Sequence, residues 1–60
     1  MNWYAKQLEE EMNALEPRIR SMYSAMKRED TPEDLKELYR EAFNKMKWKY
    51  QELKHKLELI

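Results

Sequence analysis

The feature that most constrains this chain is the spacing of its apolar residues, which recur in alternating steps of four and three. In the first half the series is Met1, Ala5, Leu8, Met12, Leu15, Ile19, Met22 and Met26. In the second half it is Tyr39, Phe43, Met46, Tyr50, Leu53, Leu57 and Ile60. This spacing places each series on one side of an α-helix and is typical of helices that pair as in a coiled coil. The sequence therefore predicts two amphipathic helices, each with one apolar seam.

The segment between the two series carries signals that end one helix and start another. Thr31 is predicted to cap the second helix with its hydroxyl. Pro32 suits the first helical position, because the N–H that it lacks would have no partner there. Glu33 and Asp34 then lie at the positive end of the helix dipole, with Asp34 at the acidic position of a capping box. The turn is therefore expected immediately before Pro32.

A chain of 60 residues forms one domain, here residues 1–60. We expect a helix over about 2–29, a turn at about 30–32 and a helix over about 32–59. Because so short a connection makes neighbouring helices run in opposite directions, the predicted fold is all-α, an antiparallel two-helix hairpin. A chain of this size buries only about 60 % of its unfolded surface, which favours dimerisation into a four-helix bundle.

Pro17 interrupts the first predicted helix. Inside a helix, proline removes one hydrogen bond and crowds the carbonyl of Asn13, at a cost of about 3 kcal/mol. One hypothesis is a kinked but continuous helix, and the alternative is a three-helix bundle in which the first helix breaks at Pro17. The continuous helix is favoured, because the apolar spacing passes through Pro17 and neither Glu16 nor its neighbours offer a good cap.

An antiparallel hairpin with its turn at residues 31–33 determines which seam residues face one another. The predicted layers are Met26–Tyr39, Met22–Phe43, Ile19–Met46, Leu15–Tyr50, Met12–Leu53, Leu8–Leu57 and Ala5–Ile60. The interhelical contacts predicted by the same register are Glu9–Lys54, Glu16–Lys47, Glu11–Lys56 and a Tyr23–Arg40 cation–π contact. Exposed ion pairs contribute about 0–1 kcal/mol each, so they choose the orientation of the helices more than they add stability.

Charge and composition narrow the functional classes. Twelve basic residues balance twelve acidic ones, so no overall field attracts nucleic acid or a membrane surface. The chain has no cysteine, which excludes disulfides and thiolate metal sites and fits a reducing compartment. No apolar run approaches the roughly 20 residues of a membrane span, and no signal-peptide core follows Met1. We therefore expect a soluble, intracellular protein.

Side chains that could carry catalysis or hold a metal are few. Glu52 and His55 match the Glu-x-x-His element of di-metal helical bundles, but the seam runs through Leu53 and both side chains are predicted to face outward. His55 is the one histidine of the sequence, and Ser21 and Ser24 are poor candidates for an activated nucleophile. We therefore expect a protein that is not an enzyme, with no cofactor, no metal site and no small-molecule substrate.

The densest basic stretch runs from Lys45 to Lys56 and includes Trp48. Lysines interleaved with aromatic rings can hold phosphates while a ring stacks on a base, which makes nucleic-acid binding one hypothesis. A helix distributes these lysines around its circumference, however, and Met46 and Tyr50 belong to the seam. Nucleic-acid binding and membrane binding are therefore disfavoured.

Apolar residues outside the seam are the strongest functional signal. They are Trp3, Tyr4, Ala25, Leu35, Leu38, Ala42, Trp48 and Leu59. One interpretation is a core stripe wider than the seam, as in ordinary bundle helices. The favoured interpretation is a protein interface, because two helices cannot cover apolar surface on both flanks and aromatic anchors dominate binding where they occur.

The predicted function is that of a non-catalytic structural protein that self-associates as a homodimer. The alternative is a small helical module, designed or excised from a larger protein, whose exposed Trp and Leu side chains bind a different protein. The helix start Thr31-Pro32-Glu33-Asp34-Leu35 resembles the idealised caps of designed helical proteins, whereas the Met-rich seam and Pro17 depart from that pattern. The residues indicate no natural family.

Overall fold

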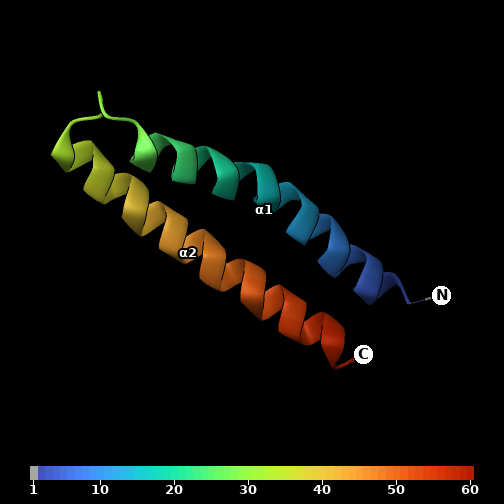
Figure 1. The fold of residues 1–60 in the computed structure, drawn as a ribbon. Coiled ribbons are helices and arrows are strands. Elements are labelled where there is room, and N and C mark those ends of the chain that lie inside the picture. The colour runs from blue at the N-terminus through green and yellow to red at the C-terminus, as the bar shows by residue number, and fades with distance from the viewer. Residues whose placement is uncertain (1) are drawn as a thin grey trace.

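The computed structural model of the chain, which describes residues 2–60, is a hairpin of two helices. Helix α1 runs over Trp3–Lys27, helix α2 runs over Glu33–Glu58, and residues 28–32 form the turn between them. The start of α1 and the end of α2 lie together at the end opposite the turn, which we call the open end (Figure 1). The predicted all-α two-helix hairpin is confirmed. Because α1 continues through Pro17, the three-helix alternative is wrong.

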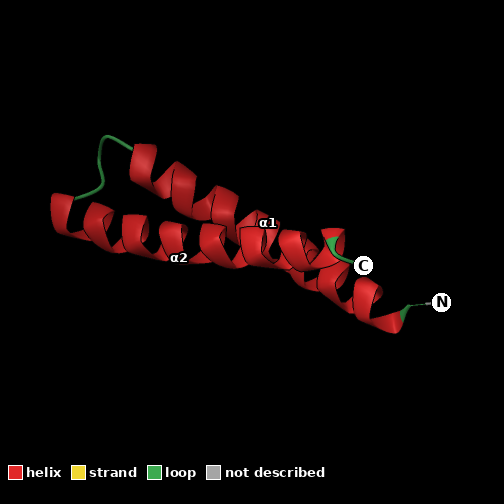
Figure 2. Cartoon of the chain, turned by 90° about the horizontal axis from the view of Figure 1, so that it is seen from below, coloured by secondary structure: helices red, strands yellow, loops and turns green. Residues whose placement is uncertain are grey.

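Burial follows the predicted seam. Every described seam residue from Ala5 to Met26 and from Tyr39 to Leu57 is buried or half-buried, with Leu8 and Leu53 the most enclosed. The prediction fails at Ile60, which is exposed because α2 ends at Glu58. Met1 lies outside the described residues. The two helices cross each other when the hairpin is viewed from below (Figure 2), and they form a rod of 47 × 15 × 11 Å.

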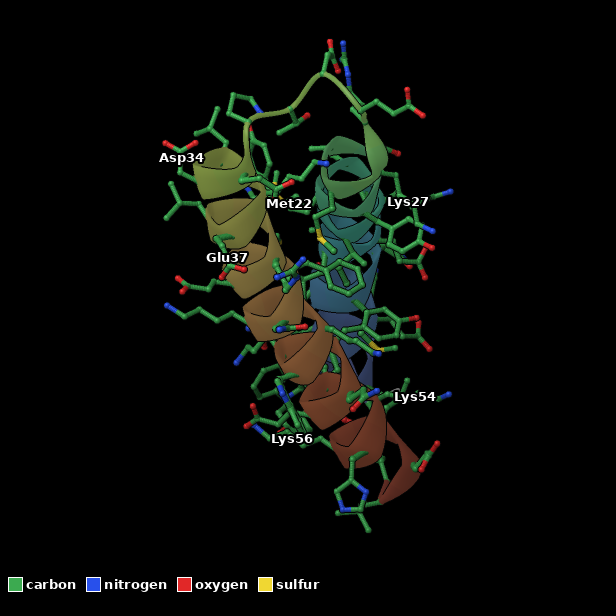
Figure 3. The ribbon with its side chains drawn as sticks, turned by 60° about the vertical axis from the view of Figure 1, so that its left-hand side comes forward. Met22, Lys27, Asp34, Glu37, Lys54 and Lys56 are labelled. Atoms are coloured by element: carbon green, nitrogen blue, oxygen red, sulfur yellow. The ribbon has the colours of Figure 1, made fainter. Side chains whose placement is uncertain are left out.

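Two contacts between the helices agree with the predicted register. The hydroxyl of Tyr50 donates a hydrogen bond to Glu16 Oε1 at 3.0 Å, next to the predicted Leu15–Tyr50 layer. The rings of Tyr23 and Phe43 lie 5.8 Å apart between centroids, next to the predicted Met22–Phe43 layer. Met22 itself lies between the helices (Figure 3).

The predicted interhelical ion pairs are wrong. Within residues 2–60, each ion pair joins side chains of the same helix or of the turn. These pairs are Arg20–Glu16, Arg28–Asp30, Lys36–Glu33, Arg40–Glu37 and Lys56–Glu52. The ring of Tyr23 lies 5.0 Å from Lys27 Nζ and so takes its cation from its own helix, whereas Arg40 pairs with Glu37. Neighbours three or four residues apart on one helix are already close, so exposed side chains meet them first.

The helix starts differ from the prediction. The side chain of Asn2 caps α1 by accepting hydrogen bonds from the N–H groups of Tyr4 at 3.1 Å and Ala5 at 3.4 Å. Thr31 does not cap α2, because its hydroxyl donates instead to the carbonyl of Ala25 at 3.1 Å. The last turn of a helix leaves carbonyls without partners, and Thr31 satisfies one of them. Helix α2 consequently begins one residue later than predicted, with Pro32 at the N-cap position.

The capping box is also wrong, and the turn is held by a different contact. The carboxylate of Asp34 accepts from the N–H of Leu35 at 3.0 Å and does not reach back to Thr31. Arg28 Nε and Nη2 donate to the two carboxylate oxygens of Asp30 at 3.1 and 3.0 Å. This contact lowers the pKa of Asp30 and raises the pKa of Arg28 through hydrogen bonding and charge. Helix α1 accordingly ends at Lys27, two residues earlier than predicted.

Candidate interaction surface

The seam leaves two flanks along the hairpin, and the first is polar. We call it the charged flank. Its residues surround a hollow of about 470 Å³ and are Glu16, Ile19, Arg20, Phe43, Lys47, Tyr50, Gln51 and Lys54. The hydrogen bond to Glu16 raises the pKa of Tyr50, with desolvation and the negative charge of Glu16 adding to the rise. Lys47 Nζ lies 6.0 Å from the centroid of the Phe43 ring, so a lysine and an aromatic ring lie side by side on this flank.

The second flank, which we call the alanine flank, carries three shallow hollows between the turn and the open end. The hollow nearest the turn is lined by Ala25, Arg28, Asp30, Thr31, Pro32, Leu35 and Tyr39. The middle hollow is lined by Pro17, Arg18, Ser21, Met22, Ala42 and Met46. The third is lined by Glu11, Ala14, Leu15, Arg18, Lys49 and Leu53. The middle hollow measures about 500 Å³, close to that of the charged flank, so the two flanks differ in lining more than in size.

The structure brings together one group of the predicted interface residues near the turn. Ala25 and Leu35 line one hollow of the alanine flank, and Ala42 lines the next. Leu38 lies three residues after Leu35 and four before Ala42, on the same side of α2. Both alanines are half-buried, whereas Leu38 is 60 % exposed. These four residues form the turn-end cluster.

A second group of predicted residues lies at the open end. Trp3 is 72 % exposed and packs edge-on against the partly exposed Tyr4, with ring centroids 6.2 Å apart. Leu59 is 73 % exposed and follows the last residue of α2, next to the exposed Ile60. We call Trp3, Tyr4, Leu59 and Ile60 the open-end cluster. Ile60 was predicted to lie in the seam, but it is exposed and therefore belongs to this cluster.

Trp48 stands apart from both clusters. It is 73 % exposed and lies midway between the seam residues Met46 and Tyr50, which places it on the side of α2 away from α1. The predicted set of eight residues therefore resolves into two groups at the ends of the hairpin and one separate tryptophan.

Sequence reasoning missed the continuity of the alanine flank. On α1 a second series in steps of three and four runs through Tyr4, Gln7, Glu11, Ala14, Arg18, Ser21 and Ala25. On α2 the equivalent series is Leu35, Leu38, Ala42, Lys45, Lys49, Glu52, Lys56 and Leu59. Both series have apolar ends and charged centres, so a search for apolar residues alone does not find them. The steps of three and four between these residues could nevertheless have revealed the flank.

The basic stretch does not form one patch. Lys47 and Lys54 line the charged flank, and Lys49 lines the alanine flank. Lys54 and Lys56 leave α2 on opposite sides (Figure 3), and Lys56 Nζ lies 3.4 Å from the carboxylate of Glu52. Met46 and Tyr50 are half-buried, as expected of seam residues.

The described residues were also compared with what a metal site and a membrane-spanning helix require. Glu52 and His55 are exposed, as predicted, and no three His, Asp or Glu side chains of residues 2–60 are grouped so that they could hold a metal ion. Over the same residues, neither helix combines the length and the apolar character that a membrane crossing requires. Comparison with protein-family models, curated proteins and solved structures finds no match to this chain.

Proposed function

We propose that the chain is a non-catalytic structural protein that self-associates as a dimer, in which two hairpins complete a four-helix bundle. The observation that carries this proposal is how little the hairpin encloses. Among the described residues, the buried side chains are Leu8 and Leu53. Each is almost completely removed from water in a single hairpin. Two side chains of this size contribute only about 2 to 3 kcal/mol each on burial, which is small against the entropy of ordering two long helices.

The shape and surface of the hairpin support the same conclusion. Its radius of gyration is 14.1 Å, whereas a compact domain of this length has about 10 Å. Its accessible surface is 5018 Å², against about 4,200 Å² for a globular monomer of this mass. The difference is close to the roughly 800 Å² per partner that a stable protein interface buries. Contact with one further copy would therefore bring the accessible surface of each chain close to that of a globular monomer of this mass.

The experiment compares two pairs of acidic substitutions on α2. Leu38→Glu with Leu59→Glu places two carboxylates on the alanine flank, where association would desolvate them without partners. Because both leucines are largely exposed in the single hairpin, the pair leaves the packing of α1 against α2 intact. The control pair, Asn44→Glu with Gln51→Glu, adds the same charge at exposed positions off the alanine flank.

Sedimentation equilibrium over a concentration series measures the outcome. We expect the unsubstituted chain and the control pair to be dimers, and the Leu38→Glu, Leu59→Glu chain to be a monomer. Mass action also makes the melting temperature of the dimers rise with concentration and leaves that of the monomer constant. An unsubstituted chain that is monomeric at all concentrations would contradict the proposal.

One observation favours a second candidate function, the binding of a different protein. Trp48 lies outside both flanks, so a dimer formed through either flank leaves this side chain in water. Exposed tryptophans are frequent energetic anchors of protein interfaces. In this alternative the chain is a helical binding module and is already monomeric. The sedimentation experiment therefore separates the two functions before any partner is identified.

A further inference from the structure

We propose that the two copies meet through their alanine flanks in opposite directions, so that the turn of each lies beside the open end of the other. This arrangement rests on the proposed self-association and specifies its geometry. The two-fold axis would lie in the interface and cross the helices beside Ala14, in the hollow that Ala14 shares with Glu11, Arg18 and Lys49. The occupant of the alanine flank is then the same flank of a second copy.

The first support is the difference in shape between the two ends. The turn-end cluster is concave, because Ala25 and Ala42 line hollows there. The open-end cluster is convex on this flank, because Tyr4 and Leu59 are exposed large side chains there. Two copies with their turns together would place hollow against hollow and protruding ring against protruding ring. Opposite directions place each protruding side chain against a hollow.

The second support is the position of these residues along each helix, at nearly equal distances on either side of the proposed two-fold axis. Tyr4 lies ten residues before Ala14 and Ala25 lies eleven after it, so an axis beside Ala14 brings Tyr4 close to the partner's Ala25. On α2 the same level falls beside Gln51, because Lys49 and Leu53 line the hollow that contains Ala14 and lie on either side of Gln51.

The same axis has a consequence on the second helix. Ala42 lies nine residues before Gln51 and Leu59 eight after it, so Leu59 comes close to the partner's Ala42. Two large side chains thus meet two alanines on both helices.

The third support is charge. Glu11 lies three residues before Ala14 and Arg18 four after it, so the axis brings Glu11 to the partner's Arg18. On α2, Lys49 and Glu52 lie on either side of the axis, and Lys49 comes to the partner's Glu52. Copies with their turns together would instead face α1 with the partner's α2 at the same level. Arg18 and Lys49 line one hollow, so that arrangement opposes Arg18 to the partner's Lys49, a like-charge contact.

One pair of like charges remains in the proposed arrangement, between Lys45 and the partner's Lys56. The ammonium group of Lys56 is 3.4 Å from Glu52 in its own chain, which offsets this repulsion. Exposed charges add little to affinity, but the difference between matched and opposed pairs selects one orientation over another. Shape, spacing and charge therefore favour the same arrangement.

The test uses a spin label at the tip of the turn. The chain has no cysteine, so Glu29→Cys gives one labelling position per copy, at an exposed residue outside both flanks. Double electron–electron resonance then measures the distance between the two labels of a dimer. Opposite directions predict a distance close to the 47 Å length of the hairpin. Turns together predict about 20 Å, the width of two helices.

The control label is Gln51→Cys, an exposed position level with the proposed axis. This label gives a separation of bundle width in either arrangement and so reports whether a dimer is present. A short distance at both positions would overturn the opposite-direction arrangement and leave self-association standing. A monomeric mass with no distance at either position would overturn both proposals. A long distance at Glu29→Cys with a short one at Gln51→Cys is the expected result.

Discussion

The charged flank and the alanine flank lie on the same two helices and border the same seam, yet different side chains line their hollows. On the charged flank, Tyr50 bonds to Glu16 and the ring of Phe43 packs beside Tyr23 over the seam. On the alanine flank, the middle hollow is lined by the small residues Ser21 and Ala42 together with the seam residues Met22 and Met46. Where small side chains lie next to the seam, as at Ser21 and Ala42, the seam methionines border a hollow.

This contrast shows how one apolar seam can serve two different surfaces. Helical periodicity assigns residues to the seam, and it does so equally for both flanks. Residues one step further round the helix then determine which side chains line each flank. In the proposed dimer, the alanine flank is the surface that associates, and the charged flank stays exposed to water.

The largest expected effect on stability comes from truncating a seam leucine that borders the alanine flank. Leu15→Ala should destabilise the protein by roughly 2–5 kcal/mol, as much as Leu53→Ala, because in the proposed dimer a partner covers the hollow that both leucines line. Ile19→Ala, a half-buried position on the charged flank, should cost less because no partner covers it. Urea unfolding followed by circular dichroism measures all three. Equal losses at Leu15 and Ile19 would remove the distinction between the flanks.

The next effect concerns Pro17, which lines the middle hollow of the alanine flank inside a continuous helix. Pro17→Ala restores an N–H for the carbonyl of Asn13 and relieves its crowding, against a small loss of rigidity in the unfolded chain. We expect a gain of about 2 kcal/mol in the free energy of unfolding, measured by thermal and urea denaturation. A loss of stability would show that the proline presets a helix start and that α1 is not one cooperative unit.

A smaller effect is expected from reversing one charge on each flank. Arg18→Glu opposes two acidic groups in the proposed dimer and should weaken association by about 1 kcal/mol, roughly fivefold in Kd. Adding Glu11→Arg to the same chain should restore the affinity, because the pair is then matched again. Arg20→Glu, on the charged flank, should leave the dimer unchanged. Sedimentation equilibrium compares the three, and equal weakening by Arg18→Glu and Arg20→Glu would contradict the flank assignment.

The smallest effect is expected on the charged flank and depends on pH. Hydrogen bonding to Glu16 raises the pKa of Tyr50 in the folded protein, so this contact stabilises the fold fully below the unfolded tyrosine value of about 10. Its contribution is lost as the pH rises through the folded pKa. Melting curves of Tyr50→Phe and the unsubstituted chain should therefore differ at neutral pH and converge at high alkaline pH. Glu16→Gln keeps an acceptor without the charge and should reduce the alkaline loss. A constant difference at every pH would show that the hydrogen bond is not the cause.

The seam could be predicted from the sequence because buried positions recur with the period of the helix. Every described residue predicted for the seam is buried or half-buried except Ile60, and the continuity of α1 through Pro17 followed from the same spacing. The helix ends were less predictable, because a short polar side chain has several partners within reach. Thr31 bonds backward to Ala25 in preference to capping α2, and Asn2 caps α1 although nothing in the periodicity marks it.

The candidate surface was predictable only in part. Leu35, Leu38 and Ala42 were placed on one flank with Ala25 nearby, and the lining of the hollows agrees with that placement. Pairing of exposed charges was not predictable, because many partners of nearly equal energy compete within a few ångströms. The grouping of Trp3 with Leu59 depends on where the two helices end, which the apolar pattern leaves open by several residues.

The turn has a consequence for how fast dimers would exchange their members. Pro32 adopts φ −59° and ψ 150°, and Thr31 precedes it, so both residues disfavour a helical path through the turn. The chain therefore resists opening into one long helix, which is the step that domain swapping would require. Copies that meet as closed hairpins can part and recombine without unfolding. Mixed labelled and unlabelled populations should consequently equilibrate at the rate of dissociation, long before either hairpin unravels.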